Sequence, residues 1–427
     1  MMRAMKNSGI ERIGDIPKDW QTIKNKYLLN QMYSGGTPTA SNDSFYADEG
    51  IPFVSISDMS TVEYVFDTKK KLTERGVGDK NLQILPKGTV LYSIYATIGA
   101  ISELAIDATI SQAMLAFSIK DGIEKQYYKY NLAAMRDYIF FSANGNTQFN
   151  LNADKVWNFT FVYPPLDEQR RISDFLDAEC SRIDSVIEQT RASIEEYKKL
   201  KQSVITQAVT KGIRPNRKMK DSGVEWIGEI PEEWDSINPK ALFSQRKDKA
   251  LPGERQLTAS QQYGVIYQDE YMERTGSKVV TVEKDFDILK HVETGDFVIS
   301  MRSFQGGLEY STNTGSISSA YVMLVPNLDK VFPQYYRWLL KSTVYIDALQ
   351  STSNMVRDGQ AMRYSNFAQV RLITVPMDEQ KEIANYLDEK CFAMEKLIEL
   401  KERFLAELES YKKSLIYEYV TGKKEVM

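Results

Sequence analysis

The chain has 427 residues, a hydrophobic content of 42%, a net charge of −4 and a pI near 5.5. This length allows two to three domains with substantial cores. The net negative charge is not typical of a nucleic-acid-binding protein. There is no signal peptide and no apolar run near the roughly 18 residues of a membrane helix, so we expect a cytoplasmic protein without a membrane partner.

A turn segment that ends in a tryptophan occurs twice. Residues 7–20 read NSGIERIGDIPKDW, and residues 221–234 read DSGVEWIGEIPEEW. Gly and Pro punctuate both copies, as they do in tight turns. We interpret Trp20 and Trp234 as packing anchors and the repeat as a sign that the chain is duplicated.

Each tryptophan is followed by a mixture of short strands, turns and a helix, roughly at 21–163 and 235–375. Strands are predicted at Ile51–Ser57, Thr89–Ile94, Ala113–Ile119, Phe159–Tyr163, Lys278–Val282, Phe297–Met301, Tyr321–Val325 and Leu372–Val375, and helices at Lys125–Phe141 and Phe332–Leu349. Residues 86–90 correspond weakly to 293–297, and residues 110–113 to 317–320. Both segments are therefore predicted to share one α+β fold that carries two different surfaces.

Residues 166–211 are predicted to form one uninterrupted helix about 65 Å long. The stretch holds no Pro or Gly; Asp167 is the expected N-cap, and Gly212 and Pro215 end the helix. From Ile172 to Ala208, mostly apolar residues recur at a mean spacing of about 3.6 residues, which makes a straight stripe along one face. A helix this long needs a partner that covers its stripe.

The partner helix is predicted at 377–421. Asp378-Glu379-Gln380 repeats Asp167-Glu168-Gln169 at an offset of 211 positions (378 − 167), and the apolar stripe recurs at the same offset. We predict that the two helices pack antiparallel as a coiled-coil-like pair, with two pseudo-two-fold related α/β domains at opposite ends. Cys180 and Cys391 fall at equivalent helix positions, where a structural role in a reducing compartment is expected.

The sequence lacks the motifs of common enzymes. His291 is the one histidine, so no second histidine can pair with it. There is no G-x-x-x-x-G-K-[ST] phosphate loop, no G-x-G-x-x-G motif after a strand and no Cys/His cluster with metal spacing. We therefore expect a non-catalytic chain without a cofactor or metal of its own.

The order of these segments resembles a type I restriction-modification specificity subunit over nearly the whole chain. The motifs that carry the resemblance are IGDIPKDW and IGEIPEEW, PPLDEQRRISDFLD and VPMDEQKEIANYLD, and QAVTKG near the end of the first helix. The loop Gly35-Gly36-Thr37-Pro38 is also similar to a common start of a recognition domain in this family. The second copy departs from the pattern in two places. It has Gln245-Arg246-Lys247-Asp248 where the first has Ser34-Gly35-Gly36-Thr37, and Val375-Pro376-Met377 in place of the double proline.

The resemblance implies two target-recognition domains, at 1–163 and 214–375, and two conserved long helices, at 164–213 and 376–427. It implies a non-catalytic reader of double-stranded DNA, in which each domain reads one half of a split, asymmetric site. Family members bind two methyltransferase subunits, which use S-adenosylmethionine, and recruit restriction subunits that translocate DNA with ATP and Mg. These cofactors are therefore expected in partner subunits and not in this chain.

Candidate DNA contacts follow from the chemistry of the predicted loops. Amide, hydroxyl and guanidinium groups read base edges, whereas Lys, Arg and backbone N–H groups bind phosphates. The candidates in the first domain are Thr37, Thr39, Asn42, Tyr95, Thr97, Asn144, Asn146 and Gln148. The candidates in the second domain are Arg246, Lys247, Arg302, Ser303, Gln305, Asn354, Arg357, Gln360 and Arg363. Tyr95 and Arg302 follow aligned strands, so an arginine at the second position is a candidate reader of guanine.

Two other classes of function remain open from the sequence. One is a structural coiled-coil scaffold with two globular heads and no role on DNA, which a duplex-binding assay would separate from a DNA reader. The other is a fused enzyme, against which the missing methyltransferase and nuclease motifs argue.

Overall fold

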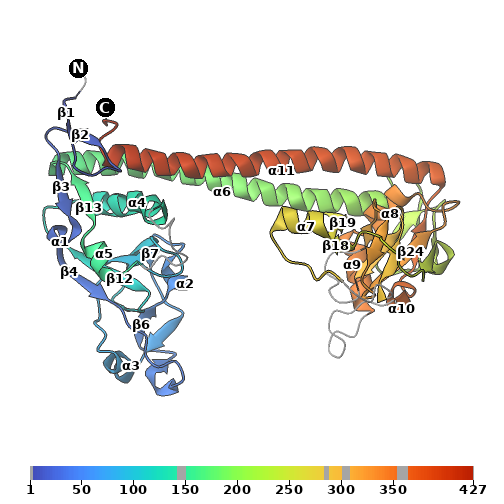
Figure 1. Ribbon diagram of the computed structural model, residues 1–427, viewed down its shortest axis with the longest axis horizontal. Coiled ribbons are helices and arrows are strands. Elements are labelled where there is room, and N and C mark those ends of the chain that lie inside the picture. Colours follow the sequence, from blue (N-terminus) through green and yellow to red (C-terminus); the bar gives the residue numbers. More distant parts are fainter. Residues whose placement is uncertain (1–2, 142–150, 283–287, 301–307, 353–363, 427) are drawn as a thin grey trace. The chain divides into compact units, whose positions relative to one another are not determined.

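The computed structural model describes residues 3–141, 151–282, 288–300, 308–352 and 364–426 (Figure 1). The chain divides into two compact units. Unit 1 consists of Met1–Thr190 together with Arg403–Met427, and unit 2 of Arg191–Glu402. Each unit therefore contains one part of each of the two long helices, α6 (Leu166–Lys211) and α11 (Met377–Val420).

Unit 1 is built on a five-stranded sheet in the order β4-β12-β9-β10-β7 and a four-stranded sheet in the order β11-β6-β8-β5. Its strands are β1 (Met5–Asn7), β2 (Asp15–Pro17), β3 (Gln21–Lys24), β4 (Leu29–Ser34), β5 (Tyr46–Ala47), β6 (Ile51–Val54), β7 (Tyr64–Val65), β8 (Lys70–Leu72), β9 (Val90–Ser93), β10 (Ile101–Leu104), β11 (Thr109–Ile110), β12 (Met114–Ile119) and β13 (Thr160–Tyr163). Its shorter helices are α1 (Asn25–Leu28), η1 (Asp43–Phe45), α2 (Ile56–Met59), α3 (Glu74–Asp79), α4 (Lys125–Phe141) and α5 (Ala153–Trp157).

Unit 2 is built on a four-stranded sheet in the order β17-β24-β21-β22. Its strands are β14 (Met219–Asp221), β15 (Glu229–Pro231), β16 (Asp235–Ile237), β17 (Phe243–Arg246), β18 (Leu257–Ser260), β19 (Gly264–Tyr267), β20 (Lys290–Val292), β21 (Phe297–Ser300), β22 (Glu309–Tyr310), β23 (Gly315–Ile317), β24 (Tyr321–Pro326) and β25 (Leu372–Thr374). Its shorter helices are η2 (Pro239–Ala241), α7 (Gln268–Thr275), α8 (Pro333–Leu339), α9 (Thr343–Ser351) and α10 (Tyr364–Phe367).

The central strand of unit 1 shows how the sheet supports two cores. Successive side chains of a strand point to opposite faces. Val90 and Tyr92 of β9 accordingly pack in a core with Phe117 and helix α4, whereas Leu91 joins a second core with Val54 and Met59. Unit 2 has a comparable aromatic core, in which the ring of Phe243 lies 5.5 Å from that of Phe297 and 5.4 Å from that of Tyr336.

The two units share one frame. The strand order β4-β12-β9-β10 in unit 1 matches β17-β24-β21-β22 in unit 2. Gly88 and Gly295 precede the matching strands β9 and β21 with φ of +88° and +102°, and donate to Leu104 O at 2.7 Å and Ser311 O at 2.8 Å. These equivalent turns confirm the weak correspondence of residues 86–90 with 293–297 and the predicted common α+β fold.

The long helices pair antiparallel within each unit. In unit 1 the rings of Phe175 and Tyr419 lie 4.4 Å apart, and Lys412 Nζ lies 2.6 Å from Asp184 Oδ1. In unit 2 Lys401 Nζ lies 5.7 Å from the ring centre of Tyr197, and Lys201 forms an ion pair with Glu395. Partners earlier on one helix therefore meet partners later on the other, as predicted. The predicted stripe faces this pairing, since Ile183, Ile187 and Ile194 are buried.

Four local predictions were wrong. The strand predicted at 51–57 ends at Val54, because Ser55 and Asp58 form a capping box that starts α2. The helix predicted at 332–349 is divided into α8 and α9. Residues 278–282 form no strand; the side chain of Gln256 takes the place of a strand partner by bonding to both N and O of Val282, at 2.9 and 2.7 Å. Asp167 is the second residue of α6 and is not its N-cap.

Candidate functional site

An Arg–Glu–Trp cluster lies at the start of each long helix. In unit 1 Trp20 Nε1 donates to Glu168 Oε2 at 2.8 Å, and Arg3 donates to the same carboxylate at 2.9 Å. In unit 2 Trp234 Nε1 donates to Glu379 Oε2 at 2.9 Å. The tryptophans are 1% and 0% exposed, which confirms the predicted anchors. The clusters place each tryptophan turn and each helix in one orientation.

Glu168 and Glu379 are the carboxylates of these clusters, and little of either side chain is exposed to solvent. The carboxylate of Glu379 is fully buried against Arg217. Burial of Glu168 raises its pKa, but hydrogen bonds from Arg3 and Trp20 outweigh this effect, so the pKa lies below the usual glutamate value. Both carboxylates therefore have an arginine and a tryptophan as partners within the fold.

A second repeated anchor joins each α/β domain to the end of the other long helix. Tyr127 Oη donates to Val420 O, and Tyr335 Oη donates to Val209 O, each at 3.0 Å. Both bonds satisfy a carbonyl in the last turn of a helix, where no intrahelical partner is available. Sequence reasoning missed these residues, although the repeated dipeptides Tyr127-Tyr128 and Tyr335-Tyr336 were a usable signal.

The predicted Gly-rich loop of unit 1 is held in place by polar contacts. Tyr46 Oη donates to Pro38 O at 2.9 Å, and Thr39 N donates to Asp79 Oδ2 at 3.4 Å. Thr37 is half-buried, while Thr39 and Asn42 are exposed. The carbonyl oxygen of the Asn42 side chain accepts from Ser44 N and Oγ, so this side chain caps η1 as well as facing solvent.

The predicted turn after β9 presents its side chains outward. Tyr95 is 49% exposed, and Thr97 is half-buried. The turn is tight, because Ala96 has a φ of +56° and Ser93 Oγ donates to Tyr95 O at 2.8 Å. The remaining candidates of the first domain lie outside the described residues: Asn144, Asn146 and Gln148.

Arg246 of unit 2 lies among three carboxylates. Its Nε donates to Asp296 Oδ2 at 2.7 Å, and its terminal nitrogens reach Glu293 at 2.9 Å and Asp248 at 3.1 Å. The hydrogen bond to Asp296, chiefly, raises the pKa of the guanidinium. A DNA contact by Arg246 stays a prediction, and these occupied donors weigh against it.

Lys247, the next predicted contact, is exposed. The other candidates of the second domain lie outside the described residues: Arg302, Ser303, Gln305, Asn354, Arg357, Gln360 and Arg363.

The register of the sheet changes how the loop after β17 aligns with the Gly-rich loop of unit 1. Arg246 pairs with Met323 of β24, and Tyr33 pairs with Ala116 at the matching position of β12. Arg246 is therefore equivalent to Tyr33, and Asp248-Lys249 is equivalent to Gly35-Gly36.

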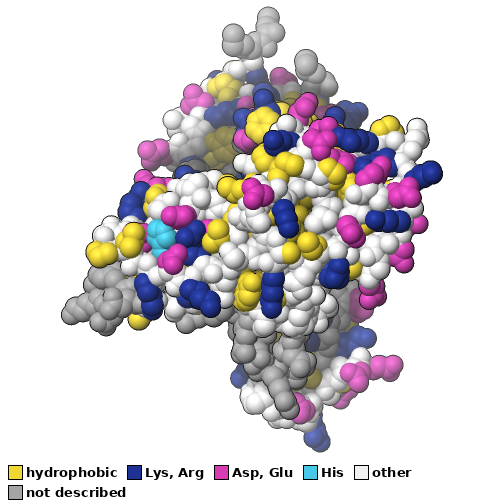
Figure 2. Space-filling view, turned by 90° about the vertical axis from the view of Figure 1, so that its right-hand side faces the viewer, with side chains coloured by type: hydrophobic (Ala, Val, Ile, Leu, Met, Phe, Trp, Pro, Cys, Tyr) yellow, Lys and Arg dark blue, Asp and Glu magenta, His cyan; other side chains and the backbone are white. Residues whose placement is uncertain are grey.

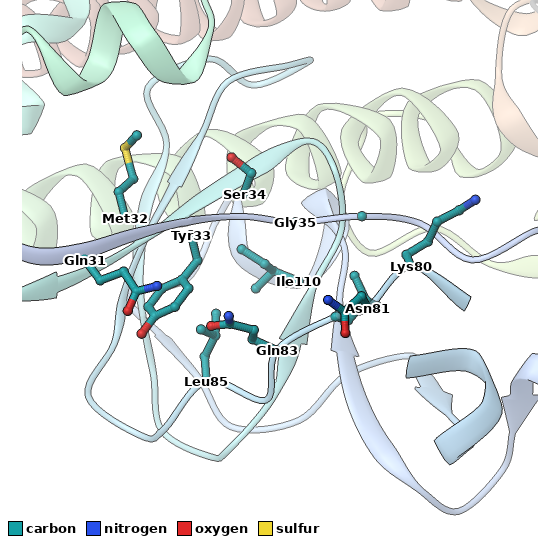
Figure 3. Close-up of a pocket in the computed structure, with 12 residues that line it drawn as sticks. Gln31, Met32, Tyr33, Ser34, Gly35, Lys80, Asn81, Gln83, Leu85 and Ile110 are labelled. Atoms are coloured by element: carbon teal, nitrogen blue, oxygen red, sulfur yellow. The ribbon is translucent and has the colours of Figure 1, made fainter. Parts of the chain in front are cut away.

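A pocket of about 270 Å³ lies beside the Gly35-Gly36 loop of unit 1 (Figure 3). Its floor is apolar, with the buried side chains of Leu85 and Ile110. Its rim carries exposed polar side chains, namely Gln31, Lys80, Asn81 and Gln83. Figure 3 shows that Gln31 and Tyr33 point to one side of β4, toward this pocket, and Met32 and Ser34 to the other. Sequence reasoning missed Lys80, Asn81 and Gln83.

Charges of both signs are mixed on the face of unit 2 that Figure 2 shows. His291 is 8% exposed, and its Nδ1 lies 2.6 Å from Glu254 Oε1.

Within the described parts of the chain, no group of three or more His, Cys, Asp or Glu side chains is placed to hold a metal ion. No helix among the described residues is long and apolar enough to cross a membrane.

Comparison with known proteins gives consistent matches. Residues 17–196 match the type I restriction modification DNA specificity domain. The chain is 29% identical over 192 residues to the type I restriction enzyme MjaIX specificity subunit of Methanocaldococcus jannaschii, a match that covers 44% of this chain and 43% of that relative. It is 25% identical to the putative MjaX specificity subunit of the same organism, over 97% of this chain and 96% of that relative.

Two solved structures share the fold over nearly the full length. One comes from work on complex assembly and conformational transition of the type I R-M system, with a TM-score of 0.69, 16% identity and coverage of 96% of this chain and 99% of that chain. The other is the HsdS subunit from Thermoanaerobacter tengcongensis, with a TM-score of 0.50, 15% identity and coverage of 96% and 98%. At these identities the likeness establishes the fold.

Proposed function

We propose that the chain is the non-catalytic DNA-recognition subunit of a type I restriction-modification complex and reads a bipartite, asymmetric site. The match of residues 17–196 to the DNA specificity domain and the full-length similarity to a putative specificity subunit support this proposal. Each α/β domain reads one half of the site. The domains comprise residues 1–163 and 214–375, and the helices at 164–213 and 376–427 set the distance between the two half-sites.

The observation that carries this proposal is the contrast between a repeated frame and unrepeated surfaces. The Arg–Glu–Trp clusters, the tyrosine anchors and the central strands recur in both units. The side chains that the frame presents differ, with Tyr33 and Gly35 in one unit where Arg246 and Asp248 stand in the other. Two readers on one frame with different surfaces suit two different half-sites, so the whole site should not be a palindrome.

The proposed DNA contacts remain those of the sequence, weighted by exposure. Thr39, Tyr95 and Lys247 are exposed and fit the role. Asn42 and Arg246 have structural partners in the folded chain and are weaker candidates. Arg302 keeps its proposed role at a guanine on sequence grounds, because arginine hydrogen-bonds both acceptors of that base in the major groove.

The proposed partners are double-stranded DNA, two methyltransferase subunits and the restriction subunits. The pairing surface within each unit buries one stripe of each long helix, while Val186, Leu200, Phe392 and Leu400 stay between 39% and 68% exposed. These apolar side chains support a protein partner on the helices. S-adenosylmethionine, ATP and Mg are then required by the partner subunits.

The test is methylation or binding across a duplex library randomised in both half-sites. Arg302→Ala should relax recognition at one base pair of the half read by residues 235–375, by roughly 1–3 kcal/mol, and leave the other half unchanged. Thr97→Ala should act only on the half read by residues 21–163. A uniform loss over all sequences would assign the residue to a phosphate contact, and wild-type binding without any sequence preference would refute the proposed function.

A further inference from the structure

The pocket beside Gly35-Gly36 marks a place where the two units differ in backbone pairing. Leu85 pairs with Ala108 in unit 1 as Val292 pairs with Gly315 in unit 2. Gln83 and Lys290 are therefore equivalent positions, two residues before each of these pairs. Their surroundings can be compared directly because the frame around them is the same.

In unit 2 this place is filled by a strand. Lys290 of β20 pairs with Ile317 on one side and with Lys249 on the other. His291 N donates to Asp248 O at 3.0 Å, so the loop equivalent to Gly35-Gly36 lies directly against β20. The Lys290 amine donates to Ser319 O at 2.9 Å and Tyr321 O at 2.7 Å. Two backbone carbonyls therefore hold the side chain of Lys290 in place.

In unit 1 the glycine loop bypasses the equivalent segment. Gly36 N donates to Ile110 O at 3.1 Å, and Gly35 N to Met114 O at 3.2 Å. A Cβ on Gly35 would lie 2.0 Å from Ser111 O, so only glycine allows this close approach. Residues 80–83 also line the pocket (Figure 3), and Lys80 and Leu82 lie close to Gly36.

We propose that this pocket is a recognition subsite for DNA, in which Gln83 and Asn81 read a base edge and Lys80 binds a neighbouring phosphate. Carboxamides supply a donor and an acceptor together, the pattern that an adenine edge presents in the major groove. The apolar floor of Leu85 and Ile110 and the ring of Tyr33 can lie against a base. The lysine stands exposed at the rim, with its Nζ 3.6 Å from Asp79 Oδ2. The inference rests on the proposed function and adds residues that no loop motif indicated.

The experiment uses the full chain, in the complex with its methyltransferase subunits, on the same randomised library. Gln83→Ala should reduce discrimination at one base pair of the half-site read by unit 1, roughly tenfold. Gln83→Lys, which places the residue of unit 2 at this position, should produce the same loss because it removes the carboxamide. Gln21→Ala, an exposed glutamine of β3 that does not line the pocket, is the matched control and should leave selectivity unchanged.

The phosphate contact has an independent readout. Lys80→Ala should weaken binding to all sequences and reduce the slope of log affinity against log salt by about one, whereas the exposed Lys87→Ala should not. The proposal is overturned if wild type is selective in this half-site and Gln83→Ala keeps the same selectivity at every position, or if selectivity changes in the other half. A wild-type chain with no preference in either half fails the proposed function instead.

Discussion

At the scale of single residues, the carboxylate of Glu379 is a buried group that depends on its partners. Glu379 is 0% exposed, and its carboxylate accepts hydrogen bonds from Trp234 and Arg217. Removing one member of a buried ion pair leaves the other charge unpaired in a poorly solvated place, which costs more than the intact pair contributes. Exposed pairs on the same helix, such as Glu382 with Arg214, carry no such penalty.

Glu379→Gln should therefore lower the free energy of unfolding of unit 2 by about 2–4 kcal/mol, since Arg217 loses its buried counter-charge. The measurement is urea unfolding followed by tryptophan fluorescence. Glu382→Gln, whose side chain is 48% exposed in the wild type, is the matched control and should cost at most about 1 kcal/mol. Equal losses in the two variants would contradict the assigned role of Glu379.

Glu168 should make the stability of unit 1 sensitive to acid. Its pKa in the folded chain lies below the ordinary value of 4.5, despite burial, because Arg3 and Trp20 bind the charged form. A lowered carboxylate pKa contributes stability above the unfolded value, and this contribution is lost as the pH falls through the folded value. The difference in Tm between wild type and Glu168→Gln should shrink from neutral pH to pH ~3. A constant difference would show that ionisation of Glu168 has no such effect.

At the scale of elements, the long helices were the most predictable part of the chain. Helix α6 has the predicted bounds, and α11 ends at Val420, one residue before the predicted end, because no Pro or Gly interrupts either stretch and Gly212 and Gly422 follow them with left-handed φ. Short strands were less predictable. Residues 279–282 have strand-forming composition, yet Gln256 satisfies Val282 and leaves Val280 87% exposed. Whether such a segment forms a strand depends on its pairing partner, and a partner that is distant in sequence leaves no local signal.

The helix pairing gives a prediction at this scale. Ile187→Asp should destabilise unit 1 by roughly 2–5 kcal/mol, because it introduces an unpaired charge at a site that is 8% exposed. Val186→Asp is the control on the neighbouring, 39% exposed position and should change stability little. Ile398→Asp should have an intermediate effect, since Ile398 is half-buried. Thermal unfolding monitored by circular dichroism checks the order, and a larger loss for Val186→Asp would contradict the packing described for α6.

At the scale of the whole molecule, the duplication could be predicted from the sequence, but the pocket of unit 1 and the alignment of the loop after β17 could not. The repeated tryptophan turns and DEQ motifs predicted two copies of one plan. The pocket of unit 1 arises where Gly36 approaches Leu82 and Lys80, which are far from it in sequence. No local sequence motif could therefore predict that Asn81 and Gln83 line it. The sequence aligned Arg246 with Gly35, and only the strand register showed that Arg246 is equivalent to Tyr33.

The duplication also predicts the composition of the complex. Because each unit offers the same helix frame, two methyltransferase subunits should bind per chain. Native mass measurement of the co-purified complex should give two to one. Any other ratio at saturation would argue against equivalent docking surfaces in the two units.

The division of the chain into units has a consequence for the order in which it folds during synthesis. Unit 2 is continuous, from Arg191 to Glu402, whereas unit 1 also needs Arg403–Met427, which are synthesised after unit 2. Leu415, Ile416 and Val420 from that last segment pack in the core that contains Ile172, Leu176 and Trp20. Unit 1 therefore emerges first from the ribosome but is completed last. The apolar face of its part of α6 stays exposed while unit 2 is synthesised. A stop codon near residue 403 would leave unit 2 with its full sequence and unit 1 without part of its core.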